Sequence, residues 1–198
     1  MLLNLSYNNR FLEMPEYKTL RKQNFSSQIY SLVPIRYEDR YLIMKWRNDQ
    51  MYHLRQNTPL TEDQQDLYFD TVVAGLFEQE KPNQILFSYL VHEDCIGYGG
   101  LVHIDWFNKS AELSFIMNTE LENVMFEKMW FIFLKLIEQV AYDELNLSVI
   151  FTYTFDLRPK LFKILNVADF KEDRTIKNVV KSDKTMEVVI HSKKNPKI

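Results

Sequence analysis

Two side chains that can transfer protons, Glu112 and His103, lie on neighbouring segments with the sequence character of strands. A carboxylate inside a cleft can have the raised pKa that a general base needs, and an imidazole titrates near neutral pH. Together they predict a proton relay that removes a proton from a nucleophile. The alternative is that Glu112 faces solvent and that His103 is structural, because most surface carboxylates and strand histidines have no catalytic role.

A second polar group follows the first predicted helix and contains Arg47, Asn48, His53 and Arg55. Guanidinium groups bind phosphate and carboxylate with paired hydrogen bonds, so this group could hold a phosphate-bearing or acidic ligand such as a nucleotide-linked sugar. The alternative is a solvated polar loop.

Cysteine and histidine usage argues against two other kinds of chemistry. Cys95 is the one cysteine, so an internal disulfide is impossible, and no basic neighbour in sequence activates its thiol. The four histidines lack the spacing of metal ligands, and we predict no metal site.

Three of the four glycines fall in the short run 96–101. Such clustering marks a place where the backbone turns tightly or is approached closely. The run opens a strand that a hairpin-length linker joins to the segment 111–117, so the two strands should be antiparallel. One surface of this hairpin would be open to a ligand.

The remaining elements follow from hydrophobic periodicity and breaker residues. They run in the order β-α-α-β-β-β-α-β-α-β-β, which predicts an α+β (mixed α/β) fold. The expected strands are 30–36, 85–92, 97–105, 111–117, 148–155, 175–180 and 185–191. The expected helices are 38–48, one opening with the capping box at Thr61, 127–144 and 157–168.

This order and several local sequences resemble the GNAT family of acyl-coenzyme A N-acyltransferases. Trp46-Arg47-Asn48 is similar to the end of the first helix in the branch that acetylates ribosomal-protein alanines and amino sugars. The runs 96–101 and 111–116 match the family's third and fourth strands. Pro34-Ile35-Arg36-Tyr37-Glu38-Asp39 is similar to its opening strand-to-helix junction, and 141–147 to the sequence before its fifth strand.

The resemblance implies a mostly antiparallel twisted sheet, splayed between its fourth and fifth strands, with helices on both faces. It implies acetyl-CoA as co-substrate, bound by the backbone of Phe115, Ile116 and Met117. In the family's pattern Glu112 would be the base, with His103 beside it. The polar loop and Tyr98 would then lie on the side of an amine acceptor. Phe162 stands where many relatives have a proton-donating tyrosine, and Tyr98 and Tyr153 are possible substitutes.

The segment 118–126 differs from the family's glycine-rich phosphate-binding turn, because it has no glycine or arginine and includes Glu120 and Glu122. Arg158 could replace the missing contacts to CoA phosphates, whereas Asp156 is expected to cap the helix that follows it. Two alternatives to an acetyl-CoA enzyme therefore stay open. One is a catalytically inactive domain that binds or assembles, and the other is a transferase with another donor, such as an acyl carrier protein.

Composition limits the partners. The net charge of −3 shows no basic surplus for nucleic acid, and no apolar run is long enough to span a membrane. We expect a cytoplasmic protein that binds a small-molecule amine, with a homodimer as one possible assembly. Residues 1–28 are expected to form an extension, and residues 29–194 the acyltransferase domain.

Overall fold

The computed structural model describes residues 15–181 and 183–198 of the chain. They form one sheet of eight strands in the order β1-β2-β3-β4-β5-β6-β8-β7. Neighbouring strands are antiparallel except β5 and β6, which are parallel. The strands are β1 Phe25–Ser27, β2 Tyr30–Pro34, β3 Ile85–Val91, β4 Asp94–Asp105, β5 Ser110–Met117, β6 Val149–Phe155, β7 Lys171–Lys181 and β8 Lys184–Lys194.

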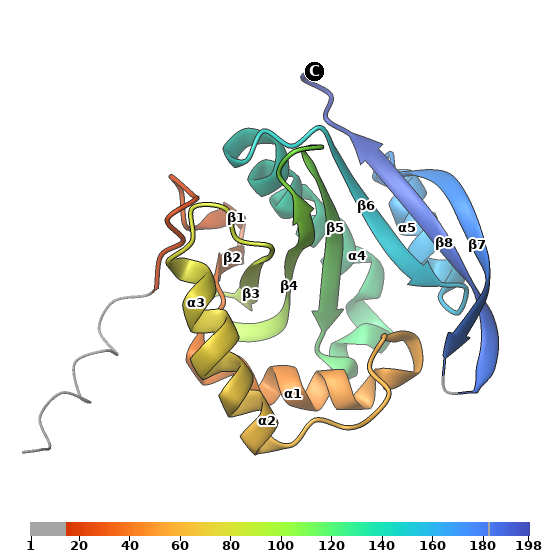
Figure 1. Cartoon of the computed structure of the whole chain (residues 1–198), viewed down its shortest axis with the longest axis horizontal. Helices are drawn as coiled ribbons and strands as arrows, with labels where there is room; N and C mark the ends of the chain where they lie inside the picture. Colours follow the sequence, from red (N-terminus) through yellow and green to blue (C-terminus); the bar gives the residue numbers. More distant parts are fainter. Residues whose placement is uncertain (1–14, 182) are drawn as a thin grey trace, which may run out of the picture.

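Helices cover both faces of the sheet, with α4 and α5 behind it and α1 to α3 on the near side in Figure 1. The mixed, mostly antiparallel architecture predicted from the sequence is confirmed. The helices are α1 Arg40–Asp49, α2 Glu62–Leu67, α3 Ala74–Phe77, α4 Thr119–Glu138 and α5 Pro159–Val167. Tyr37–Asp39 and Met51–His53 are short 3-10 turns, and Tyr68–Val73 and Gln139–Glu144 are π-helical.

Several element boundaries differ from the sequence expectation. Helix α4 begins at Thr119 rather than near residue 127, because the side chain of Asn118 accepts a hydrogen bond from Glu120 N–H and caps the first turn. Asp156 does not cap α5, and that prediction was wrong. The N-cap residue of α5 is Arg158, whose side chain makes no capping hydrogen bond. Pro159 is the first residue of the helix, where its restricted φ favours the helical conformation.

Residues before position 28 contribute to the sheet and to its core. β1 pairs with β2 at the sheet edge, and Tyr17, Leu20 and Phe25 are buried. The Tyr17 hydroxyl donates to the carbonyl of Leu86 and accepts from the amide of Leu86. The division of the chain at residue 28 stays a prediction, and residues 1–14 lie outside the described residues.

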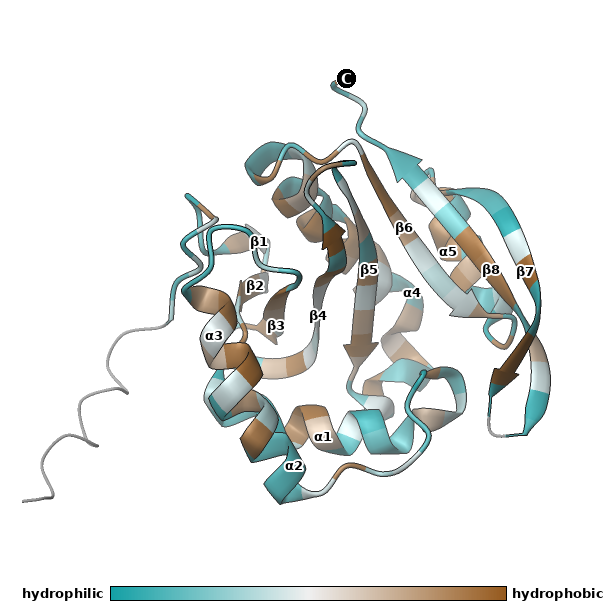
Figure 2. Cartoon of the chain, viewed as in Figure 1, coloured by the Kyte–Doolittle hydropathy of each residue, from teal (hydrophilic) through white to brown (hydrophobic). Residues whose placement is uncertain are grey.

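The core centres on aromatic rings between β4, β5 and α4. Phe115 stacks on Phe133 with ring centroids 4.0 Å apart, and Trp130 meets Phe115 edge to face. In Figure 2, hydrophobic segments lie in the central strands, and also in α2, α3 and the end of β7. Gly99 lets β4 and β5 approach under this stack, because a Cβ there would lie 2.3 Å from Ser114 O and 2.8 Å from Phe133.

Candidate active site

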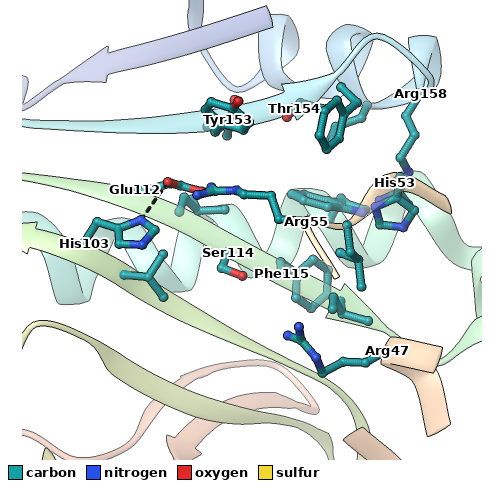
Figure 3. Close-up of a pocket in the computed structure, with 18 of the residues that line it drawn as sticks. Arg47, His53, Arg55, His103, Glu112, Ser114, Phe115, Tyr153, Thr154 and Arg158 are labelled. Atoms are coloured by element: carbon teal, nitrogen blue, oxygen red, sulfur yellow. Dashed lines mark hydrogen bonds and ion pairs between the residues drawn. The ribbon is translucent and has the colours of Figure 1, made fainter. Parts of the chain in front are cut away.

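β5 and β6 separate part-way along their length. They pair only at Ser110↔Val149, Ala111↔Ile150 and Glu112↔Phe151. Beyond Glu112 the strands diverge, and a cleft of about 400 Å³ opens between them. The splay predicted between the fourth and fifth strands is therefore present, at the strands now numbered β5 and β6. Figure 3 shows β5 and β6 on opposite sides of this cleft.

Glu112 lies where the two strands part, and it is buried with 6% exposure. One carboxylate oxygen lies 2.9 Å from His103 Nδ1, and the other accepts a hydrogen bond from Arg55. The three side chains come from β5, β4 and the loop after α1 and meet at the cleft (Figure 3). The solvent-facing alternative for Glu112 therefore does not hold.

His103 reaches Glu112 because β4 is irregular at this point. The β4–β5 register shifts between Val102 and Asp105, and His103 has φ +50°, in the left-handed region. Such bulges redirect side chains and often lie beside active sites. Partial desolvation and the charge of the nearby Arg55 lower the pKa of His103. A neutral imidazole facing a carboxylate through Nδ1 carries its hydrogen there, which leaves the Nε2 lone pair free to accept a proton.

The loop after α1 brings Arg55 to the site, and β7 holds that loop. Arg55 lies over the Tyr153 ring, 4.3 Å from its centroid, and burial lowers the pKa of its guanidinium. The amine of Lys181 donates to the carbonyls of Leu54 and Gln56, the residues on either side of Arg55. Lys181 is thus a positioning contact that the sequence pattern did not indicate.

The other predicted acceptor-side residues have different environments. Arg47 lines the cleft and donates to the Tyr98 hydroxyl (2.6 Å) and to Gln56 Oε1 (3.1 Å). Tyr98 thus contacts the site through Arg47. Asn48 shapes the loop instead, because its side chain bonds the backbone N–H and carbonyl of Leu60.

His53 lines the cleft as a neutral imidazole. Burial and the charge of Arg158 lower the pKa of His53 to about 3. Its ring nitrogen lies 3.2 Å from Gln50 Oε1. Gln50 is itself buried and donates to the carbonyl of Met117, 2.7 Å away. Gln50 and His53, which follow α1, therefore lie at one end of the gap between β5 and β6.

The predicted donor strand offers backbone groups to the cleft. Asn118 N–H donates to Ile96 O on β4, 2.8 Å away. Because successive peptide groups of a strand point in opposite directions, the N–H groups of Leu113 and Phe115 face β6. The pairing of Glu112 with Phe151 uses the Leu113 N–H, whereas the Phe115 N–H lies beyond the paired stretch and faces the gap. Ile116 lines the cleft, but its backbone faces β4. The Met117 amide points the same way as that of Phe115, but Met117 does not line the cleft, so Phe115 has the backbone amide best placed to meet a pantetheine arm.

Two buried polar atoms along this cleft lack partners. Trp130 Nε1 on α4 and Thr152 Oγ1 on β6 have no hydrogen-bond partner among the described residues. Buried polar groups are normally paired, so unpaired ones beside a cleft indicate a ligand with polar groups of its own. The alternating amides and carbonyls of pantetheine fit this requirement. The sequence alone did not indicate a role for either residue, because an isolated Trp or Thr in such a segment is usually part of the hydrophobic core.

The start of α4, where the family places its phosphate turn, is occupied by the protein's own groups. Asn118 Oδ1 accepts from Glu120 N–H, and the Asn118 carbonyl accepts from the N–H groups of Leu121 and Glu122. Arg158 forms an ion pair with Glu122, and its guanidinium lies 5.0 Å from the centre of the Phe126 ring. The cleft therefore fits the pantetheine arm, whereas this corner does not fit a pyrophosphate.

Residues 32–186 match the family described as the acetyltransferase (GNAT) domain. The match spans more than half of the chain, and the chain belongs to this family. It is a GNAT-type N-acetyltransferase with acetyl-CoA as its acyl donor. Among curated protein sequences, none matches this chain.

Solved structures of acetyltransferases share the fold. A spermidine N-acetyltransferase from Vibrio cholerae, in complex with CoA and spermine, superposes with a TM-score of 0.72 at 15% identity over 85% of this chain and 97% of that one. A dodecameric structure of spermidine N-acetyltransferase from the same organism gives 0.67 at 15% identity, over 86% and 96%. A probable acetyltransferase gives 0.70 at 16%, over 88% and 98%. At these identities the likeness concerns the fold.

Among residues 15–181 and 183–198, no group of three acidic, histidine or cysteine side chains is arranged to bind a metal ion. Within the same residues, no helix has the length and hydrophobicity of a membrane span.

Proposed function

We propose that the enzyme acetylates an amine on a small acceptor that also carries an anionic group, of the kind found in nucleotide-linked amino sugars. The observation that carries this proposal is the environment of Arg47. This half-buried cation lines the cleft, and its partners among the described residues, Tyr98 and Gln56, are neutral. A desolvated guanidinium without a carboxylate favours a ligand that brings one negative charge or more.

A polyamine acceptor fits the same cleft less well. The cleft is lined by three arginines, Arg47, Arg55 and Arg158. Among the described residues that line it, the one carboxylate belongs to Glu112. Because Glu112 is already paired with Arg55 and His103, the surface offers little to bind several ammonium groups. The resemblance of Trp46-Arg47-Asn48 to the amino-sugar branch supports the same choice.

In the proposed reaction the Glu112–His103 pair removes the proton from the acceptor amine. His103 Nε2 takes this proton, while the Glu112 carboxylate holds Nδ1–H and stabilises the imidazolium that forms. The nitrogen attacks the thioester carbonyl carbon as a neutral amine and gives up this proton as the new bond forms. A C–N bond forms, the C–S bond breaks, and a thiolate leaves.

Two further groups complete the chemistry. The N–H group of Phe115, beyond the last paired residues on the cleft side of β5, stabilises negative charge on the carbonyl oxygen. The Tyr153 hydroxyl, on the opposite wall, is available to return a proton to the thiolate. Positioning of the two substrates supplies much of the rate enhancement, so few catalytic groups are needed.

The acceptor proposal is tested by comparing kcat/KM for a nucleotide-linked amino sugar, the neutral amino sugar without the nucleotide, and spermidine. We expect the anionic acceptor to be preferred over spermidine by at least about tenfold, the value of one charge-assisted hydrogen bond. Arg47→Gln should remove this preference while leaving turnover of the neutral amino sugar unchanged. A native enzyme that prefers spermidine would refute the proposal.

A further inference from the structure

Three backbone donors at the start of α4 are already engaged and cannot bind a phosphate. The N–H groups of Glu120, Leu121 and Glu122 are each hydrogen-bonded to Asn118, through its side chain or its carbonyl. A helix N-terminus binds an anion through such amides when they are free. Here the acidic side chains of Glu120 and Glu122 already lie in the first turn and balance the helix dipole.

The one arginine at this corner is also engaged. Arg158 is 8% exposed, is paired with Glu122, and stacks over the rings of Phe126 and Trp130. Releasing it toward a phosphate would leave the Glu122 carboxylate, itself largely buried, without its counter-charge. Lys160 and Lys163 on α5 are exposed, so salt screens their attraction for a phosphate.

In the cleft between β5 and β6, by contrast, several polar groups have no partner among the described residues. Trp130 Nε1 and Thr152 Oγ1 are buried and unpaired among the described residues, and the amide of Phe115 lies beyond the paired part of β5 and faces the gap. Polar groups are therefore free where a pantetheine arm would lie and engaged where its nucleotide would lie.

We propose that this transferase recognises its acetyl donor through the acetyl-pantetheine arm, and that the nucleotide of CoA contributes little to binding. The inference needs the family's transfer activity but not the identity of the acceptor. Pantetheine thioesters occur on CoA and on carrier proteins, and the structure assigns recognition to the part that the two share.

The test measures dissociation constants by calorimetry without acceptor, at about 0.15 M salt. Acetyl-pantetheine should bind less than tenfold more weakly than acetyl-CoA. A tenfold or larger loss would overturn the inference, because two or three phosphate hydrogen bonds are worth more than that factor. Since no acceptor is present, failure here is distinguishable from failure of the acceptor proposal. An acetylated phosphopantetheinyl carrier protein forms a third arm, and its binding relative to acetyl-pantetheine shows whether a carrier surface adds affinity.

Variants sharpen this measurement. Glu122→Gln frees Arg158 and should tighten acetyl-CoA about fivefold or more while leaving acetyl-pantetheine unchanged. Glu120→Gln removes an equal charge from the same turn without touching Arg158, and it should change neither by more than about twofold. Trp130→Phe keeps the ring and removes the N–H, so it should weaken both donors by the same factor. If Glu122→Gln tightens both donors equally, or Trp130→Phe weakens acetyl-CoA alone, the assignment is wrong.

Discussion

Glu112 and His103 form the smallest unit with a defined chemistry in this molecule. The carboxylate lies 2.9 Å from Nδ1 and is also held by Arg55, so it is better suited to orient the imidazole than to take a proton alone. His103 is largely exposed, with 63% of its side chain accessible, and can reach a bound amine through Nε2. From these environments we infer a division of roles in the proposed reaction, with His103 as the base and Glu112 as its partner.

His103→Ala should lower kcat/KM by about 10²- to 10⁴-fold, the usual contribution of a general base. Glu112→Gln should lower it as well, while the dissociation constant of the donor changes little in both variants. Steady-state kinetics and calorimetry make the comparison. His92→Asn, a change at an exposed turn, is the matched control and should retain full activity. A His103→Ala variant with native kcat/KM would remove this residue from the mechanism.

The acid limb of the pH profile should belong to His103. Partial desolvation and the charge of Arg55 lower its pKa, so the imidazole loses its proton below the ordinary value of about 6.5. kcat/KM should therefore stay level from neutral pH down to about 6.5 and fall only at lower pH. A limb centred above pH 7 would show that another group carries the proton.

His53 should make stability, rather than activity, depend on pH. Its pKa of about 3 lies below the value near 6.5 expected in the unfolded chain, so the unfolded state binds more protons as pH falls. The stability is present above pH 6.5 and decreases toward pH 3. Between pH 6.5 and 5 the loss from this group is about 1.5 kcal/mol. Denaturant unfolding of His53→Gln should show a flatter dependence, and an unchanged slope would contradict the assignment.

Between elements, the contact that matters most to the site joins β7 to the loop after α1. Lys181 is 6% exposed and its amine bonds two loop carbonyls, one on each side of Arg55. β7 lies at the sheet edge and β5 near its centre, so this single side chain links the outer hairpin to the catalytic strand.

Lys181→Met should leave the loop untethered and raise the KM of the acceptor by about tenfold, as expected when hydrogen bonds to a charged group are lost. The dissociation constant of the donor should not change. Lys184→Met on the same hairpin is exposed and serves as the control. Equal effects of the two substitutions on KM would argue that Lys181 acts only through hairpin stability.

Glycine positions give a paired test of element packing. Gly99→Ala brings a Cβ to 2.3 Å from a backbone oxygen that cannot move easily, and should destabilise the fold by about 2 kcal/mol or more. Gly75→Ala, in α3 with open space around it, should stabilise by about 0.5 kcal/mol or more. Chemical denaturation measures both changes. Similar free-energy changes for the two would contradict the close approach of β4 and β5.

At the scale of the whole molecule, much of the fold was predictable because periodicity and hairpin-length linkers are local signals. The splay followed from the family resemblance, and the three-residue pairing of β5 with β6 confirms it. The meeting of Arg55, His103 and Glu112 was not predictable, because it depends on a bulge at His103 and a tether from Lys181. The unpaired atoms Trp130 Nε1 and Thr152 Oγ1 could not be predicted either, because finding them requires the burial and the hydrogen-bond partners of each atom.

Saturation with acetyl-CoA should raise the melting temperature, because a ligand that binds only the folded state stabilises it by mass action. A hundredfold excess over the dissociation constant adds about 2.7 kcal/mol. For a domain of this size that corresponds to a rise of about 5 °C or more in a thermal scan. An unchanged transition at millimolar acetyl-CoA would argue against donor binding in this cleft.

The unpaired indole of Trp130 also makes the cleft optically visible. Its ring lies against Phe115 and Phe126, and its N–H is the group left without a partner among the described residues. Indole emission shifts to longer wavelength when the N–H gains a polar partner, so filling the cleft should change the intrinsic fluorescence of the unlabelled protein. Trp46 and Trp106 do not line the cleft, and the Trp106 N–H already donates to the Pro82 carbonyl, so both should emit unchanged. Donor arrival could then be followed in stopped flow on a native side chain, before any bond is made or broken.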